Sequence, residues 1–181
     1  IVGSGGVLSH APRRSQSMAM MIDAFQPEGI THLSVDSIFM MPHLGVLSAV
    51  HPRAATEVFD RDCMVYLGAC VAPRGRAKEG STVLEYEFDR GGQTVREKLL
   101  AGEIKFHPFG LGETAELRLT PARGMDVGAG PGRPFNGKIR GGVVGLVLDG
   151  RGRPLVLPED EAVRKKKIVE WNRAMDLYPT Y

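Results

Sequence analysis

Cysteine is scarce in this sequence, and its two cysteines are poorly placed to form a disulfide. Cys63 and Cys70 lie in one apolar run, and the segment from Cys63 to Val71 is predicted to be a strand buried on both faces. In a continuous strand the two residues would lie about 23 Å apart on opposite faces, whereas a disulfide requires Cα atoms within about 7 Å. We therefore expect two free thiols and a reducing, cytoplasmic location, and not a disulfide-rich secreted scaffold.

Long apolar runs and histidines at metal-ligand spacing are also missing. No stretch approaches the roughly 20 apolar residues of a membrane span, and none resembles a signal peptide. The five histidines, at positions 10, 32, 43, 51 and 107, include no pair at zinc-ligand spacing. The one basic cluster, residues 164–167, lacks interleaved aromatic residues and follows acidic ones, as a solvated helix face does. We therefore expect no membrane, zinc or nucleic-acid role.

An initiator methionine is absent too. The sequence opens with Ile1-Val2-Gly3, which is predicted to be a buried strand that enters a glycine-rich turn. A natural N-terminus is rarely so apolar. The sequence is therefore interpreted as the C-terminal part of a longer protein.

The hydrophobic pattern changes near Pro73. Before it, apolar residues recur at helical spacing between strand-like runs, which predicts the order β-α-β-α-α-β. The first helix is expected to begin at Pro12 with Ser9 as its cap, and Pro42 and Pro52 are expected in the first turns of two short helices. The residues expected to be buried on these helices are Met18, Met21, Ile22, Phe25, Leu44, Leu47, Val50, Ala55, Val58 and Phe59.

After Pro73 the pattern is rich in β-structure. Leu84, Tyr86 and Phe88 alternate with glutamates, as in a half-buried strand. Residues 143–148 and 154–157 are predicted to form a hairpin, and a closing helix is expected from residue 159, with Ile168, Trp171 and Met175 on one stripe. The predicted fold class is thus an α/β part, residues 1–72, followed by a β-rich (α+β) module, residues 73–181.

The stretch Gly3-Ser4-Gly5-Gly6 is the strongest local signal for a ligand. Three glycines in four positions allow close approach of the backbone and unusual φ values, and amide groups at the start of the next helix favour an anion or a ribose hydroxyl. The stretch matches neither the dinucleotide fingerprint nor the P-loop. A tight turn without a ligand is the alternative.

Three further features have structural and functional alternatives. His10, beside the glycine-rich loop, is interpreted as a capping or packing residue. Asp36, at the end of a predicted strand, either points into a cleft or caps the following helix. The loop Asp126–Gly132 is interpreted as a turn, with a ligand or partner loop as the alternative; Gly130 stands where an actin-type phosphate loop has a hydroxyl. No Ser-His-Asp arrangement follows from the spacing.

Several blocks of sequence together resemble one known family. They are residues 1–12 (IVGSGGVLSHAP), 35–45 (VDSIFMMPHLG), 126–132 (DVGAGPG), 141–149 (GGVVGLVLD) and 152–155 (GRPL), in this order. They resemble the glutamate mutase accessory proteins, a family called GlmL or MutL that is unrelated to mismatch repair. The blocks span nearly the whole chain.

That family is similar to the actin, sugar kinase and Hsp70-like ATPases. The resemblance implies that residues 1–72 are a remnant of an actin-like ATPase lobe and that Gly3, Ser4, Gly5 and Gly6 lie on the adenosine side of an ATP site. It places the phosphate loops and the carboxylates that position Mg²⁺ upstream, and it implies no catalytic residue in this chain. The implied activity is ATP-dependent maintenance or reactivation of an adenosylcobalamin-dependent mutase, with the mutase subunits as partners.

Two other functions remain as alternatives. In the first, the β-rich half is a partner-binding module and the glycine-rich loop has no nucleotide role. In the second, the chain is related to hydantoinase-like metal hydrolases, which the absence of ligand spacing disfavours.

We predict that residues 1–181 alone bind ATP weakly or not at all and do not hydrolyse it. The reason is that the resemblance places the loops that hold the charged half of the nucleotide upstream of this sequence. Isothermal titration calorimetry checks the prediction, and an affinity in the micromolar range would contradict it.

Overall fold

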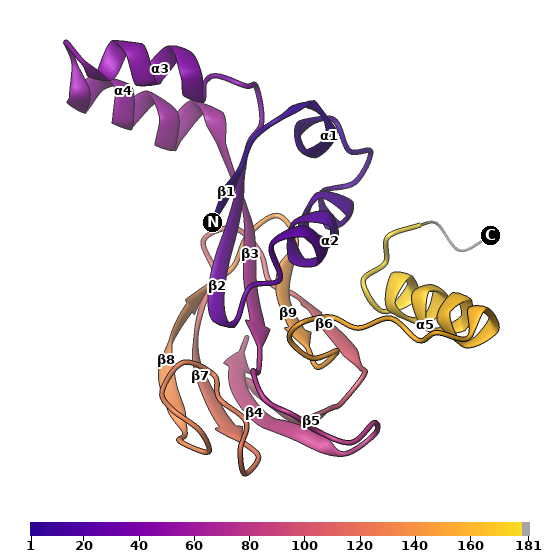
Figure 1. Cartoon of the computed structure of the whole chain (residues 1–181). Coiled ribbons are helices and arrows are strands. Elements are labelled where there is room, and N and C mark those ends of the chain that lie inside the picture. Colours follow the sequence, from indigo (N-terminus) through magenta and orange to yellow (C-terminus); the bar gives the residue numbers. More distant parts are fainter. Residues whose placement is uncertain (179–181) are drawn as a thin grey trace.

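The computed structural model describes residues 1–178, which form two β-sheets packed face to face and five α-helices (Figure 1). The five-stranded sheet has the order β1-β2-β3-β9-β6, and the four-stranded sheet has the order β5-β4-β7-β8. The first sheet consists of β1 (Val2–Gly3), β2 (Gly29–Asp36), β3 (Met64–Ala72), β9 (Gly145–Asp149) and β6 (Ile104–Pro108). The second consists of β5 (Gln93–Leu100), β4 (Thr82–Arg90), β7 (Thr114–Pro121) and β8 (Phe135–Arg140). The fold is a mixed α/β structure that is compatible with the α+β class.

The helices lie outside the two sheets. They are α1 (Gly6–Ser9), α2 (Arg14–Phe25), α3 (Met41–Ser48), α4 (Pro52–Val58) and α5 (Glu161–Ala174), and a π-helical turn, η1 (Phe59–Cys63), follows α4. Figure 1 shows that α3 and α4 form a hairpin projecting beyond the strands and that α2 lies beside the five-stranded sheet. The order predicted for residues 1–72 is confirmed, and α1 is an additional short helix. The prediction that the first strand is buried is wrong, because Ile1 and Val2 are 47% and 43% exposed.

The middle of the five-stranded sheet, which consists of β9 and residues 67–72 of β3, is buried on both faces, and each face has its own core. Between the sheets, Val71 and Leu148 pack with residues of the second sheet such as Leu117. On the other face, Leu33 and Val147 pack with α2 and with residues near the end of α5. A strand covered on both sides must be apolar on both sides, which explains the continuous apolar run in β3.

The first helix begins later than expected. Ser9 is the last residue of α1, where its hydroxyl donates to the Gly5 carbonyl at 3.1 Å, so it does not cap a helix at Pro12. The chain turns again before α2 begins at Arg14. Met18, Met21 and Ile22 are buried as expected, whereas Phe25, the last residue of α2, is 54% exposed.

The α3–α4 hairpin has its own small core. Pro42 and Pro52 lie in the first turns, as predicted, because proline has no amide hydrogen to contribute there. Leu44 and Ala55 are buried together, with Leu47, Val58 and Phe59 packed around them. The prediction for Val50 is wrong: this residue lies in the turn between the helices and is 71% exposed.

The prediction of two free, buried cysteines is confirmed, although they do not share a strand. Cys63 ends the π-helical turn η1, and β3 begins only at the next residue. Cys70 lies inside β3. Burial raises the pKa of both thiols, so both are held in the protonated form that reacts poorly.

The predicted hairpin between residues 143 and 157 is wrong. β9 pairs in parallel with β3 and antiparallel with β6, and residues 150–157 form no strand. The buried Asp149 carboxylate at the end of β9 instead binds Arg151 and Arg153, both at 2.9 Å. Gln26 then accepts a hydrogen bond from the amide of Leu155 at 2.7 Å. These polar contacts turn the chain toward α2 and away from a hairpin.

The β-rich patterns and the closing helix are largely confirmed. Leu84, Tyr86 and Phe88 are buried in β4, as their alternation predicted. In α5, Asp160 caps the first turn and Trp171 donates its indole N–H to the Gly102 carbonyl at 2.9 Å. Met175, just after α5, is buried, while Ile168 of the same stripe is 37% exposed. The boundary predicted between residues 72 and 73 stays a prediction; strands from both sides of it share the five-stranded sheet.

A polar network crosses the interface between the sheets. The Tyr86 hydroxyl lies 2.8 Å from Nε2 of His107 and 3.0 Å from a carboxylate oxygen of Glu97. Lys105 completes the network by donating to Glu97 at 2.6 Å. The ring of Phe88 lies edge-on to His107, with 5.1 Å between the ring centroids. Burial lowers the pKa of His107, although the charge of Glu97 opposes this.

We predict that Asp149→Asn destabilises the protein strongly, by about 3 kcal/mol or more, because it leaves the buried guanidinium group of Arg153 without a carboxylate and that of Arg151 with Asp23 alone. Glu57→Gln is the control, since it removes a solvent-exposed ion pair with Arg53. Urea unfolding of both variants gives the free energies. Equal, small losses for the two variants would contradict a structural role for Asp149.

We predict that His107 contributes to acid destabilisation. Because folding lowers its pKa, the unfolded chain binds the proton more readily, and stability is lost as pH falls below the ordinary value of 6.5. His107→Phe should therefore lose less unfolding free energy between pH 7.5 and pH 5.5 than the unchanged protein. The folded state also lowers the pKa of His32, so some dependence should remain in the variant. An unchanged pH dependence would rule out this contribution.

Candidate functional site

The glycine-rich loop lies at one edge of the five-stranded sheet. Gly3 ends β1 and Gly6 begins α1. β1 and β2 are parallel neighbours, so the loop and Asp36, the last residue of β2, lie at the same edge of the sheet. The Ser4 hydroxyl donates to the Asp36 carboxylate at 3.4 Å. In α/β sheets the carboxyl ends of parallel strands are the usual place for ligands.

Asp36 is a helix-capping residue, one of the two alternatives that the sequence left open. Its side chain is fully buried, and its two oxygens accept the amides of Met40 at 3.1 Å and Met41 at 2.8 Å. Burial raises the pKa of this carboxyl, but the hydrogen bonds from Met41, Met40 and further donors outweigh burial and lower it overall. Asp36 therefore stays ionised and ties the glycine-rich loop to the start of α3.

The three glycines of the loop differ in the physical constraints that act on them. A Cβ on Gly3 would lie 2.7 Å from Cδ1 of Leu8 and 3.0 Å from the sulfur of Met21, so a side chain there would require both of these side chains to shift. Gly5 has φ 120°, which other residues avoid, with open space around it. Gly6 has neither constraint: its nearest neighbour would be Nδ1 of His10 at 3.9 Å. Gly6 is thus the position at which fold and packing do not already account for glycine.

The interpretation of His10 as a capping residue is confirmed. His10 follows the last residue of α1, and its amide donates to the Gly6 carbonyl. Its Nδ1 lies 3.1 Å from the same carbonyl oxygen and 3.0 Å from the Ser9 hydroxyl. The side chain therefore closes the short helix directly beside the loop.

A groove of about 560 Å³ opens beside Gly6. One wall comes from α1 and the turn after it, a second from α2, and a third from residues at and beyond the end of α5. Its described lining residues are Gly6, Val7, His10, Ala11, Pro12, Gln16, Ala19, Met20, Asp23, Asn172, Leu177 and Tyr178, and none of these is lysine or arginine. Of the four residues predicted to bind the nucleotide, Gly6 lines this groove.

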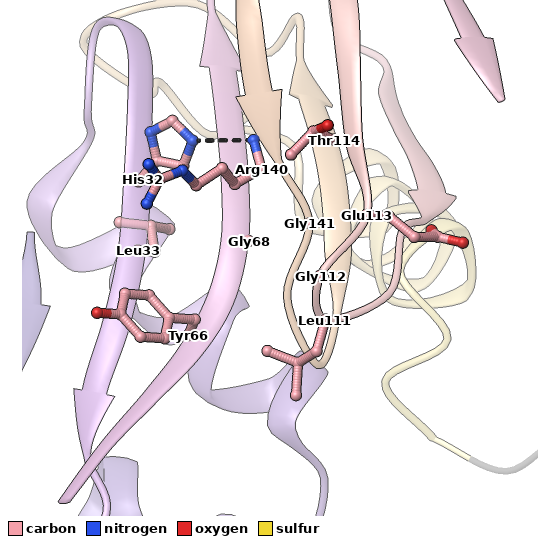
Figure 2. Close-up of a pocket in the computed structure, with 10 residues that line it drawn as sticks. All are labelled: His32, Leu33, Tyr66, Gly68, Leu111, Gly112, Glu113, Thr114, Arg140 and Gly141. Carbon is pink, nitrogen blue, oxygen red and sulfur yellow. Dashed lines mark hydrogen bonds between the residues drawn. The ribbon is translucent and has the colours of Figure 1, made fainter. Parts of the chain in front are cut away.

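A second cavity, of about 540 Å³, lies on the other side of the five-stranded sheet (Figure 2). It is bounded by His32 of β2, Tyr66 of β3, Arg140 of β8 and the loop between β6 and β7. No sequence pattern predicted this cavity. These residues are far apart in the sequence and form no local motif, so only the pairing of the strands brings them together.

The loop Asp126–Gly132 is a turn, as predicted. A carboxylate oxygen of Asp126 accepts the amides of Gly128 at 2.7 Å and Gly130 at 2.9 Å, and the backbone of Asp126 pairs with Arg74. In residues 1–178, no three His, Cys, Asp or Glu side chains converge as a metal site requires. No helix in the same range is long and apolar enough to cross a membrane.

Comparison with protein families gives a match over the N-terminal part of the chain. Residues 1–63 match the family described as MutL protein. The resemblance to this family is confirmed for that segment, which contains the glycine-rich loop and the capping residue Asp36. The blocks at residues 126–132 and 141–149 lie outside the match. Comparisons with curated proteins and with solved structures gave no match.

Proposed function

We propose that this chain is part of an ATP-binding accessory protein that maintains or reactivates an adenosylcobalamin-dependent mutase of the glutamate mutase type. The MutL match over residues 1–63 supports the accessory role. In this proposal residues 1–72 belong to a lobe of the actin-like ATPase superfamily. Gly3, Ser4, Gly5 and Gly6 form the adenosine side of the ATP site, and the mutase subunits are the partners.

The groove beside Gly6 is the observation that carries the proposal. The groove opens between α1, α2 and the end of α5, where Gly6 presents backbone without a side chain. Ala19 and Met20 offer apolar surface to a purine ring, and Asn172 offers an amide group for hydrogen bonds. Such a lining suits the uncharged half of a nucleotide.

The charge of the groove also suits the adenosine half of ATP rather than its phosphates. Asp23 is the one carboxylate among the described lining residues, and Arg151 pairs with it at 2.7 Å. A triphosphate placed here would meet a carboxylate and no lysine or arginine of the described lining. The proposal therefore assigns the phosphates and Mg²⁺ to other parts of the protein, and it assigns no metal ligand to residues 1–178.

The α3–α4 hairpin supports the proposed contact with a partner. Ile38, Phe39, Val46 and Val50 expose 52–77% of their surface on or beside this projecting element (Figure 1). Exposed apolar residues gathered on one element are typical of protein-binding surfaces. The sequence alternative placed the partner-binding surface in the β-rich half, whereas this apolar surface lies on the α3–α4 hairpin. A partner-binding protein without a nucleotide role is the second candidate function.

We predict that Gly6→Val in the intact protein lowers ATP and ADP affinity at least about tenfold, or about 1.4 kcal/mol, because the side chain would enter the groove. Thermal stability should change little, since Gly6 has an ordinary φ and open space. Gly45→Val is the matched control: Gly45 is also a helical glycine in open space, and it lies on α3, away from the groove. Calorimetric titration measures affinity, and thermal unfolding measures stability.

The outcome separates the two candidate functions. Unchanged nucleotide affinity in Gly6→Val would support the partner-binding function and reject the adenosine site. Gly5→Val tests the turn instead, because its φ of 120° makes a β-branched residue unfavourable whether or not a ligand binds. A loss of stability in Gly5→Val with no effect in Gly6→Val would make the loop purely structural.

A further inference from the structure

The cavity in Figure 2 lies where the second sheet stops covering the first. Ala69 and Val71 of β3 lie against the second sheet in the core between the sheets. Tyr66, nearer the start of β3, is 40% exposed and borders the cavity instead. The loop between β6 and β7 and the end of β8 close the other sides. Its volume of about 540 Å³ is in the range of small-molecule sites.

The mouth of this cavity carries Arg140, an exposed arginine without an ion-pair partner in residues 1–178. Arg140, the last residue of β8, extends its side chain toward His32 in Figure 2. Within residues 1–178 its guanidinium group makes no hydrogen bond and has no carboxylate oxygen within 4.0 Å. By contrast, Arg118 on the neighbouring strand pairs with Glu87 at 2.9 Å. Five N–H donors of Arg140 are therefore available at the cavity.

His32 and the Arg140 backbone fix the geometry on this side. Nε2 of His32 accepts the amide of Arg140 at 3.4 Å, which sets β8 against β2 at this point. Burial, and then the charge of Arg140, lower the pKa of His32. The imidazole is therefore favoured in its neutral form, and Arg140 supplies the positive charge of the cavity.

The carboxylate in the cavity wall is engaged elsewhere. Glu113 accepts the amide of Gly110 at 2.6 Å and lies 3.9 Å from Arg90. Figure 2 shows its side chain on the opposite side of the cavity from His32 and Arg140. Glu113 therefore does not neutralise Arg140.

Apolar side chains form the rest of the mouth. Leu111, on the loop between β6 and β7, is 62% exposed and borders the cavity. A ligand that buried this side chain would gain free energy from the apolar surface removed from water. Tyr66 presents its ring, while its hydroxyl donates to Asp60. An occupant that covered both residues would remove apolar surface from water at the place where Arg140 can bind an acid group.

We propose that this cavity binds a small organic anion, with its carboxylate or other acid group on Arg140 and its apolar body against Tyr66 and Leu111. The site uses β2, β3, β8 and the loop between β6 and β7, and it does not include the glycine-rich loop. The proposal of this anion site therefore does not depend on the proposed nucleotide site.

Fluorescence titration with 8-anilinonaphthalene-1-sulfonate tests the proposal on the chain of residues 1–181. This probe joins an acid group to an aromatic body and becomes fluorescent in apolar surroundings. Arg140→Gln should weaken its binding at least about tenfold. Arg140→Lys should retain part of the affinity, because a point charge remains without the guanidinium fork. Arg118→Gln, which removes an equal charge outside the cavity, should leave the affinity unchanged.

Two further measurements locate the site and define its ligand class. Leu111→Trp should reduce probe binding by filling the mouth of the cavity. Phenylacetate should displace the probe at lower concentration than the neutral phenylacetamide, which has the same ring.

Each result bears on the proposal. Unchanged binding in Arg140→Gln, or equal displacement by the acid and the amide, would overturn the anion assignment. Weaker binding in Arg140→Gln together with unchanged binding in Leu111→Trp would show attraction to an exposed charge alone, and this also overturns the cavity site. Thermal unfolding verifies that each variant is folded. If Arg140→Gln does not fold, the probe affinity of Arg140→Lys is compared with that of the unchanged chain instead.

Discussion

The burial of β3 and β9 on both faces is the constraint on which the rest of the structure depends. Strand β9 and residues 67–72 of β3 have no solvent-facing side and need cover above and below, because their exposed apolar area would otherwise destabilise the fold. Helix α2 gives that cover on one face and the four-stranded sheet gives it on the other. Both candidate sites follow from this arrangement: the groove lies beside α2, and the anion cavity lies where the second sheet ends.

Buried carboxylates organise the ends of the central strands. Asp36 at the end of β2 and Asp149 at the end of β9 are both fully buried and ionised, and each is matched by several donors. Asp36 orients the loop that leads to α3, whereas Asp149 holds Arg151 and Arg153. A buried charge is tolerated only when it is fully paired, so these residues fix the loops rather than react with a ligand. Arg151 also forms an ion pair with Asp23, which lines the groove.

The glycine-rich loop shows why composition alone does not define a ligand site. Gly3 satisfies packing and Gly5 satisfies a backbone angle, and both requirements would exist in a protein that binds nothing. Gly6 alone lacks such a requirement and also lines the groove. The functional hypothesis therefore rests on one residue of the four, and the geometry around that residue decides which substitution is informative.

Local patterns in the sequence determined the local structure of this protein. The alternation in β4, the prolines that begin α3 and α4 and the buried face of α2 depend on neighbours within a few residues, where period and propensity act. The pairing of β9 was different: its partners β3 and β6 lie tens of residues away, and an apolar run does not specify which strand it joins. The path of residues 150–157 and the cavity at Arg140 also depend on contacts between segments that are distant in the sequence. Only the tertiary structure decided them, because long-range contacts bring together residues that no local spacing relates.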